Sequence, residues 1–266
     1  MSADLHAFLA RHLRLFVLTG AGCSTDSGIP DYRDAHGNWK RPPPVNFASF
    51  MDNEAVRQRY WARSLAGWPR VHRAKPNAAH AALSRLERQG RIELLVTQNV
   101  DGLHQAAGSV QVIDLHGRID RVRCMECAQL LAREALQEQL LRCNPHWAGL
   151  TALAAPDGDA DLDGLPFDSF VVPACRHCGG VLKPDVVFFG ESVPRERVEE
   201  ARRRLERADA LLVVGSSLMV YSGYRFVQAA AELNRPIAAV NLGLTRADAL
   251  LTLKVRAPCA EALAGL

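Results

Sequence analysis

Four short runs of apolar residues, spread along the whole chain, constrain the fold more than any other feature of this sequence. They are residues 15–19 (LFVLT), 94–97 (LLVT), 211–215 (LLVVG) and 237–241 (IAAVN). Such runs, without polar alternation, are typical of strands buried on both faces of a parallel sheet. The intervening segments, such as 195–207 and 224–234, have helical apolar spacing. The alternation predicts an α/β fold with a Rossmann-like doubly wound parallel sheet.

The segment at about 118–185 breaks this alternation. It holds two C-x-x-C pairs, a helical pattern at 134–141, and a stretch at 148–170 rich in Ala, Asp, Gly and Pro. We interpret it as a small module inserted into a domain made of residues 1–117 and 186–266. The stretch at 148–170 is long enough for a functional or a disordered loop. We expect the chain to rejoin the sheet through residues 186–189.

The cysteines indicate a metal site rather than disulfides. The chain has 7 cysteines, and an odd number argues against a disulfide framework. Four thiolates suit one structural Zn²⁺, and two C-x-x-C pairs supply them: Cys124, Cys127, Cys175 and Cys178. The gap between the pairs exceeds the usual spacing of about 15–20 residues, which the inserted helix and loop would explain. Unrelated cysteines or a redox pair are the alternatives.

Charge and hydropathy exclude some functions. A net charge of +3 gives no case for binding nucleic acid or a membrane surface. No apolar run approaches the roughly 18 residues that span a bilayer. Because the first predicted strand begins at Leu15, little chain is left for a signal peptide, and we expect a cytoplasmic protein.

A glycine-rich turn follows the first predicted strand. Gly20 and Gly22 stand where a dinucleotide-binding turn lets the backbone approach a pyrophosphate, and a helix N-terminus beyond would supply N–H donors. Thr25 replaces the last glycine of G-x-G-x-x-G. The acidic residue that a dehydrogenase carries about twenty residues on is also missing. A plain tight turn is the alternative.

Two further polar groups follow predicted strands. Gln98, Asn99 and Asp101 lie in TQNVDGLH, at the edge where parallel sheets bind ligands. They would hold a carboxamide and ribose hydroxyls, or Asn99 or Asp101 would simply cap the next helix. His116 lies in LHG, where the large domain meets the inserted module. It is a candidate general base, with a structural histidine as the alternative.

These motifs occur together in a distinctive order. GAGCSTDSGIPDYRD, TQNVDGLH, LHG, the paired C-x-x-C, KPDVVFFGE, GSSLMVYSG and VNLG follow one another along nearly the whole chain. The set resembles the sirtuin family of NAD-dependent protein deacylases. RYWARSLAGWP and CNPHW…APDGD are most similar to the class II branch, in particular to its mitochondrial lipoamidase and ADP-ribosyltransferase type.

The resemblance implies NAD as a co-substrate, one structural Zn²⁺ and an acyl-lysine protein or peptide as partner. It makes His116 the general base, and it implies that residues 186–191 pair with the extended peptide. Tyr32 stands where the family more often has Phe. The residues implied to contact NAD are Gly20, Ala21, Gly22, Ser24, Asp31, Tyr32, Arg33, Gln98, Asn99, Asp101, Gly215, Ser216, Ser217, Asn241, Gly243 and Cys259.

Tyr60 and Arg63 suggest an acyl preference. They are three residues apart in an expected helix at 52–65, so they share a face. A phenol beside a guanidinium would bind a carboxylate, and the spacing resembles the acidic-acyl pocket of desuccinylase-type class II sirtuins. A solvated arginine is the alternative.

Other functions compete with lysine deacylation. Protein ADP-ribosylation would share the fold and the first chemical step. A nicotinamide-dependent dehydrogenase would need the missing ribose-binding acid, and a zinc-ribbon nucleic-acid binder would need a basic, aromatic module. The sequence does not indicate the oligomeric state.

Overall fold

The computed structural model describes residues 3–149, 153–154, 156, 159–162 and 164–266. Its helices are α1 (Ala3–Arg11), α2 (Phe47–Asp52), α3 (Glu54–Arg73), α4 (Ala78–Arg88), α5 (Leu103–Ala106), α6 (Arg133–Cys143), α7 (Arg195–Arg207), α8 (Tyr221–Glu232) and α9 (Cys259–Leu263). Its strands are β1 (Leu15–Thr19), β2 (Ile92–Thr97), β3 (Val112–Asp114), β4 (Gly117–Cys124), β5 (Leu130–Ala132), β6 (Leu153–Ala154), β7 (Ala160–Asp161), β8 (Leu182–Val186), β9 (Ala210–Val214), β10 (Ile237–Val240) and β11 (Leu253–Val255).

The larger part of the molecule is built on a six-stranded sheet. Its strand order is β11-β10-β9-β1-β2-β3, and every neighbouring pair is parallel. The four predicted runs form β1, β2, β9 and β10, which confirms the predicted α/β fold. The strand order reverses between β1 and β9, so the sheet has the topological switch point at which doubly wound folds bind ligands.

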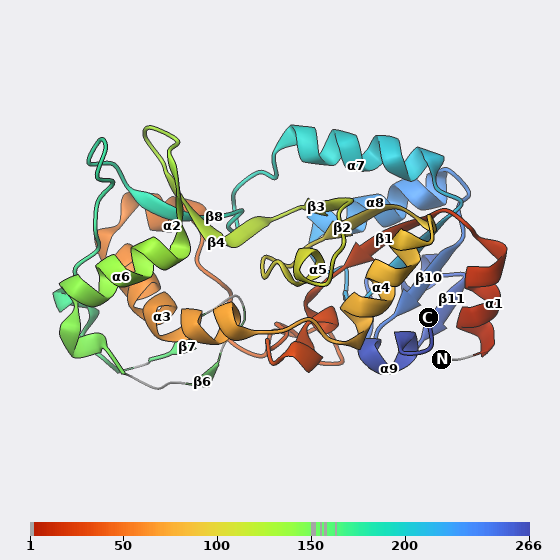
Figure 1. Ribbon diagram of the computed structural model, residues 1–266, viewed down its shortest axis with the longest axis horizontal. Helices are drawn as coiled ribbons and strands as arrows, with labels where there is room; N and C mark the ends of the chain where they lie inside the picture. Colours follow the sequence, from red (N-terminus) through yellow and green to blue (C-terminus); the bar gives the residue numbers. More distant parts are fainter. Residues whose placement is uncertain (1–2, 150–152, 155, 157–158, 163) are drawn as a thin grey trace.

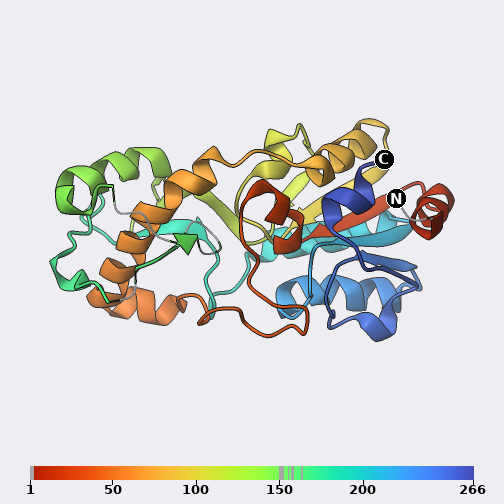
Figure 2. The same cartoon turned by 90° about the horizontal axis from the view of Figure 1, so that it is seen from below.

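Helices cover both faces of this sheet (Figures 1 and 2). On one face α1, α4 and α9 pack their apolar side chains against Val17 of β1. On the other face α7 and α8 pack against Phe16 and Leu18 of the same strand. Asn77 caps α4, because its side chain accepts from the backbone N–H of Ala79. The sheet is thus a rigid base for the loops that follow its strands.

The smaller part contains the cysteine pairs and lies at the opposite end from both chain termini (Figure 1). Its antiparallel sheet has the order β5-β4-β8. Phe50 of α2 and Trp61 of α3 pack with Val122 and Leu136 in one apolar cluster. The division expected from the sequence puts α2 and α3 in the larger part, whereas the core contacts of α2 and of the first half of α3 belong to the smaller one. The end of α3 packs its Trp68 and Val71 against the larger part. We therefore propose that the smaller part is built from two chain segments.

Residues 186–189 do not rejoin the large sheet, so that expectation is wrong. Val186 ends β8 in the small sheet, and Val187 donates its N–H to the carbonyl of His116 at 2.8 Å. Phe189 then accepts from the N–H of Phe47 at 2.8 Å. The segment is apolar because it passes between the two parts of the molecule and lines a cavity there.

Among the described residues, no helix is both long and apolar enough to cross a membrane. Of the loop at 148–170, residues 150–152, 155, 157–158 and 163 lie outside the described residues.

Candidate active site

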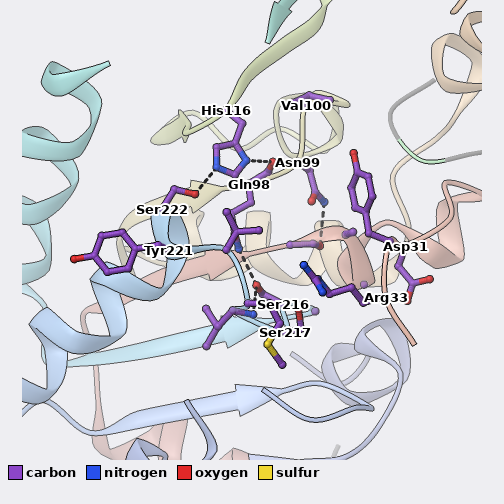
Figure 3. A pocket seen from close by; sticks show the side chains of 18 of the residues that line it. Asp31, Arg33, Gln98, Asn99, Val100, His116, Ser216, Ser217, Tyr221 and Ser222 are labelled. Carbon is purple, nitrogen blue, oxygen red and sulfur yellow. Dashed lines mark hydrogen bonds between the residues drawn. The ribbon is translucent and has the colours of Figure 1, made fainter. Parts of the chain in front are cut away.

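A cavity of about 1160 Å³ lies at the carboxyl ends of β1, β2, β9 and β10 (Figure 3). Its walls contain Gly20, Ala21, Gly22, Asp31, Tyr32, Arg33, Gln98, Asn99, Gly215, Ser216, Ser217, Asn241, Gly243 and Cys259. His116 also lines it. Of the residues implied to contact NAD, Ser24 and Asp101 are not on the walls. The fold therefore gathers segments from both halves of the sequence at the switch point of the sheet.

The glycine turn after β1 is needed for close packing against the turn after β9. The N–H of Gly22 donates to the carbonyl of Gly215 at 2.8 Å. A Cβ on Gly20 would lie 2.8 Å from Cβ of Ser216, and one on Gly22 would lie 3.0 Å from Cα of Gly215. Because neither turn can yield without moving the other, a side chain at Gly20 or Gly22 would distort this wall of the cavity.

The expected helix beyond this turn is wrong. The chain forms two short 3₁₀ turns, Ala21–Cys23 and Thr25–Ser27, and Gly28 then ends them in the left-handed region at φ 84°. The Thr25 hydroxyl donates to the carbonyl of Gly22 at 3.1 Å, a local contact that competes with a continuous helix. The Ser24 hydroxyl donates to Asp101 Oδ2 at 2.7 Å. The structure therefore supplies the close backbone approach but not a helix N-terminus.

The polar residues after β2 connect the turns around the cavity. Gln98 donates through Nε2 to Ser216 Oγ at 2.8 Å, and Asn99 donates through Nδ2 to the carbonyl of Gly20 at 3.1 Å. Asp101 has the capping role considered as an alternative, because Oδ1 accepts from the N–H of Leu103 at 2.9 Å. Gln98 and Asn99 thus face the cavity, while Asp101 supports it from behind.

The segment at 31–40 forms the outer wall. The Arg33 guanidinium donates to the carbonyl of Gly37 at 2.7 Å and lies 3.9 Å from the ring centroid of Trp39. Asp31 forms an ion pair with Lys40. Sequence reasoning missed Trp39 and Lys40, although an aromatic side chain close to a glycine-rich turn is a usable signal.

His116 is held at both ring nitrogens (Figure 3). Nδ1 lies 2.9 Å from the carbonyl oxygen of Gln98, and Nε2 lies 2.8 Å from Ser222 Oγ. Burial lowers the pKa of His116 to about 4; the Gln98 hydrogen bond opposes this shift, while Arg197 and Arg225 add to it. A ring with this pKa is neutral at pH 7, as a general base must be. Ser222 was not foreseen from the sequence.

The four predicted cysteines come together in the smaller part. Their sulfurs lie within 4.8 Å of one another, with Cys124 and Cys178 at 3.4 Å and Cys127 and Cys175 at 3.9 Å. Sulfurs about 2.3 Å from one tetrahedral Zn²⁺ would lie about 3.8 Å apart. The residue after each pair has positive φ, 59° at Ala128 and 78° at Gly179. Two similar turns thus bring four thiols close enough together to hold a metal ion.

A second group of possible ligands was not foreseen. Cys23, His80 and His104 are buried, with one ligand atom of each within 4.8 Å of the others. His80 Nδ1 accepts from the N–H of Asn77 at 3.3 Å, so the ring proton lies on Nε2 when the ring is neutral. A protonated Nε2 is a donor, which argues against a metal here.

Tyr60 and Arg63 are not among the described residues that line the cavity. The Arg63 guanidinium pairs with both oxygens of Asp159, at 2.8 and 2.9 Å. Tyr60 packs against Phe50 and Phe188, and burial raises its pKa well above the usual tyrosine value. A carboxylate of the chain itself thus occupies the Arg63 guanidinium, which argues against an acidic-acyl receptor at this position.

The comparisons with known proteins agree with this geometry. Residues 20–222 match the Sir2 family. An NAD-dependent protein deacetylase of Xanthomonas campestris pv. campestris (strain B100) is 68% identical over 262 residues, covering 98% of this chain and 89% of that relative. The NAD-dependent protein lipoamidase sirtuin-4, mitochondrial, of Bos taurus is 48% identical over 263 residues, covering 98% and 84%.

Solved structures show the same likeness in three dimensions. A structure described as Sir2 with p53 peptide and NAD⁺ has a TM-score of 0.81 at 31% identity, covering 99% of this chain and 96% of its own. Sir2Tm bound to a propionylated peptide has a TM-score of 0.76 at 30% identity, covering 98% and 94%. On the family match, the identity to its relatives and the shared fold, this chain belongs to the Sir2 family, the sirtuins.

Proposed function

We propose that this protein is an NAD-dependent protein lysine deacylase that transfers the acyl group from lysine to ADP-ribose and releases nicotinamide. The observation that carries the proposal is a neutral His116 on the wall of a large cavity at the switch point of the sheet. The deacetylases of Xanthomonas and Bradyrhizobium, 68% and 66% identical, support the same activity.

The residues around the cavity fit NAD. When bound, NAD would supply an activated ribose carbon from which nicotinamide can leave. Asn99 and Gln98 place amide groups at the end of β2, suited to carboxamide and ribose oxygens. On the other side of the switch point, Gly215 and Ser216 follow β9, and Asn241 follows β10. We propose that these residues hold the adenosine half, with Cys259 near the adenine.

His116 would accept a proton from a ribose hydroxyl at Nε2. The carbonyl of Gln98 can only accept a hydrogen bond, so Nδ1 carries the ring proton and Nε2 carries the lone pair. The neutral ring takes one proton and later returns it to solvent or product. A positioned base of this kind contributes about 10²–10⁴-fold to a rate.

The segment after β8 would bind the substrate peptide. Lys183 is buried and donates to Glu191 Oε2 at 3.1 Å, and the same oxygen accepts from the N–H of Phe188 at 2.9 Å. This network fixes the backbone of residues 188–191 on the cavity wall, with Phe189 38% exposed. An extended acyl-lysine peptide could add to this backbone by β-augmentation.

We propose that Cys124, Cys127, Cys175 and Cys178 hold one structural Zn²⁺. Four protein thiolates leave no open coordination position, so the ion would stabilise the smaller part without entering the reaction. The cytoplasmic location expected from the sequence stays a prediction, and subcellular fractionation tests it.

Nicotinamide release is the direct test of the proposed activity. The purified protein is incubated with NAD and a panel of acyl-lysine peptides, with the matching unmodified peptides as controls. We expect nicotinamide and deacylated peptide in equal amounts, and only with acylated peptide. Nicotinamide release that leaves every peptide acylated would contradict deacylation and favour ADP-ribosylation.

A further inference from the structure

Ser222 is the side chain in contact with the nitrogen that the proposed reaction uses. Its Oγ lies 2.8 Å from His116 Nε2, although the two residues are 106 positions apart in the sequence. Both side chains line the cavity, and the contact is visible in Figure 3. We propose that Ser222 is a positioning residue that holds the base nitrogen of His116 toward the cavity; this inference rests on the proposed function.

The direction of both hydrogen bonds follows from the partners. Because the Gln98 carbonyl accepts from Nδ1–H, the lone pair of the neutral ring is on Nε2. The Ser222 hydroxyl therefore donates to Nε2. With one partner on each nitrogen, the ring has a fixed orientation and a fixed tautomer before any substrate enters.

Capping of the N-terminus of α8 does not explain why a serine stands at position 222. Serine near a helix N-terminus usually accepts from a backbone N–H two or three residues later. Here Val220 is the N-cap of α8, it makes no side-chain cap hydrogen bond, and Ser222 is the second residue of the helix. The Ser222 hydroxyl instead contacts His116, so we attribute its position to this contact in the cavity.

Two arginines near His116 lower its pKa, which is the direction in which Ser222 also acts. Arg197 of α7 and Arg225 of α8 disfavour a positive ring, while the carbonyl of Gln98 at the end of β2 favours one. Donation from Ser222 to the lone pair stabilises the neutral ring further. Loss of this donor should therefore raise the pKa of His116.

Ser222 must give way during the reaction. A ribose hydroxyl that donates its proton to Nε2 has to occupy the position that the Ser222 hydroxyl fills in the structure. The proton passes from the ribose oxygen to Nε2, and Ser222 neither gains nor loses a proton over the cycle. Its hydroxyl stands in for the substrate hydroxyl until the substrate binds.

Three variants test this role. Ser222→Ala removes the donor, Ser222→Thr keeps it, and Ser49→Ala makes the same change at an exposed position of α2. We measure kcat/KM against pH, KM for NAD, and the titration of the His116 ring by NMR without substrate, with His116→Ala identifying the signal.

For Ser222→Ala we expect the acid limb of kcat/KM and the NMR titration to move up by about half to one pH unit. We expect kcat to fall about three- to thirtyfold through looser ring orientation, with KM for NAD within about twofold. Ser222→Thr should restore kcat and the titration of His116 to the wild-type values. Ser49→Ala should match wild type in every measurement. If Ser222→Ala does not fold, Ser222→Cys, a weaker donor, should give a smaller shift in the same direction.

Unchanged titration of His116 in Ser222→Ala would overturn the inference, whatever the activity. Equal losses in Ser222→Ala and Ser222→Thr with an unmoved acid limb would also overturn it, because they would indicate packing alone. A wild-type protein that releases no nicotinamide would overturn the proposed function instead, and the NMR titration would still decide whether Ser222 acts on His116.

Discussion

At the scale of the residue, the account depends on His116. Burial holds its pKa near 4, so the ring stays neutral and active as the pH falls below the ordinary histidine value of about 6.5. We expect His116→Ala to lower turnover by about 10²–10⁴-fold, with NAD affinity and melting temperature nearly unchanged. His6→Ala on the exposed face of α1 is the matched control. Turnover of His116→Ala near the wild-type value would contradict the assigned role.

The role of Arg63 depends on an ion pair with a residue that is distant in the sequence. Its guanidinium pairs with Asp159, 96 positions later in the sequence. We expect Arg63→Met to lower the free energy of unfolding by about 1 kcal/mol, as for a partly exposed ion pair. We also expect the ratio of glutaryl-lysine to acetyl-lysine turnover to stay unchanged. A selective loss with the glutaryl peptide would restore Arg63 as the receptor for an acidic acyl group.

At the scale of the element, the first C-x-x-C turn connects β4 to β5 and the second leads into β8 of the small sheet. Metal binding and folding are coupled in such sites. We therefore expect Cys124→Ser to lose zinc and to lower the melting temperature, while Cys143→Ser, an exposed cysteine outside the set, should keep about one zinc per chain. Elemental analysis and thermal unfolding measure both effects. A wild-type protein purified without chelator that holds no zinc would refute the site.

The elements also show what the sequence can and cannot predict. The strands β1, β9 and β10 are buried throughout, so their residues are apolar except for Thr19, and the sequence pattern predicts them. Strand β11 is only partly buried and contains Lys254, so it gave no comparable run. Residues 186–189 are apolar because they line a cavity, and composition does not separate that case from a buried strand. The motif order indicated the four cysteines that come together, His116 and part of the cavity wall.

At the scale of the whole molecule, function depends on contacts that no local pattern contains. His116 lies where β3 leads into β4, its partner Ser222 belongs to α8, and the segment at 187–189 crosses between the two parts. The large sheet brings the ends of its strands together, and the small sheet places the extended segment opposite them. Sequence spacing could identify the groups but not the hydrogen bond from Ser222 or the ion pair that occupies Arg63.

The fate of the acyl group tests the central claim most directly. A peptide carrying a ¹³C-labelled acetyl-lysine is incubated with NAD and the wild-type protein, and the products are analysed by mass spectrometry. We predict that the labelled acetyl group appears on ADP-ribose, in an amount equal to the nicotinamide released and to the free lysine formed. Labelled acetyl that stays on the peptide while ADP-ribose is attached to protein would contradict the account.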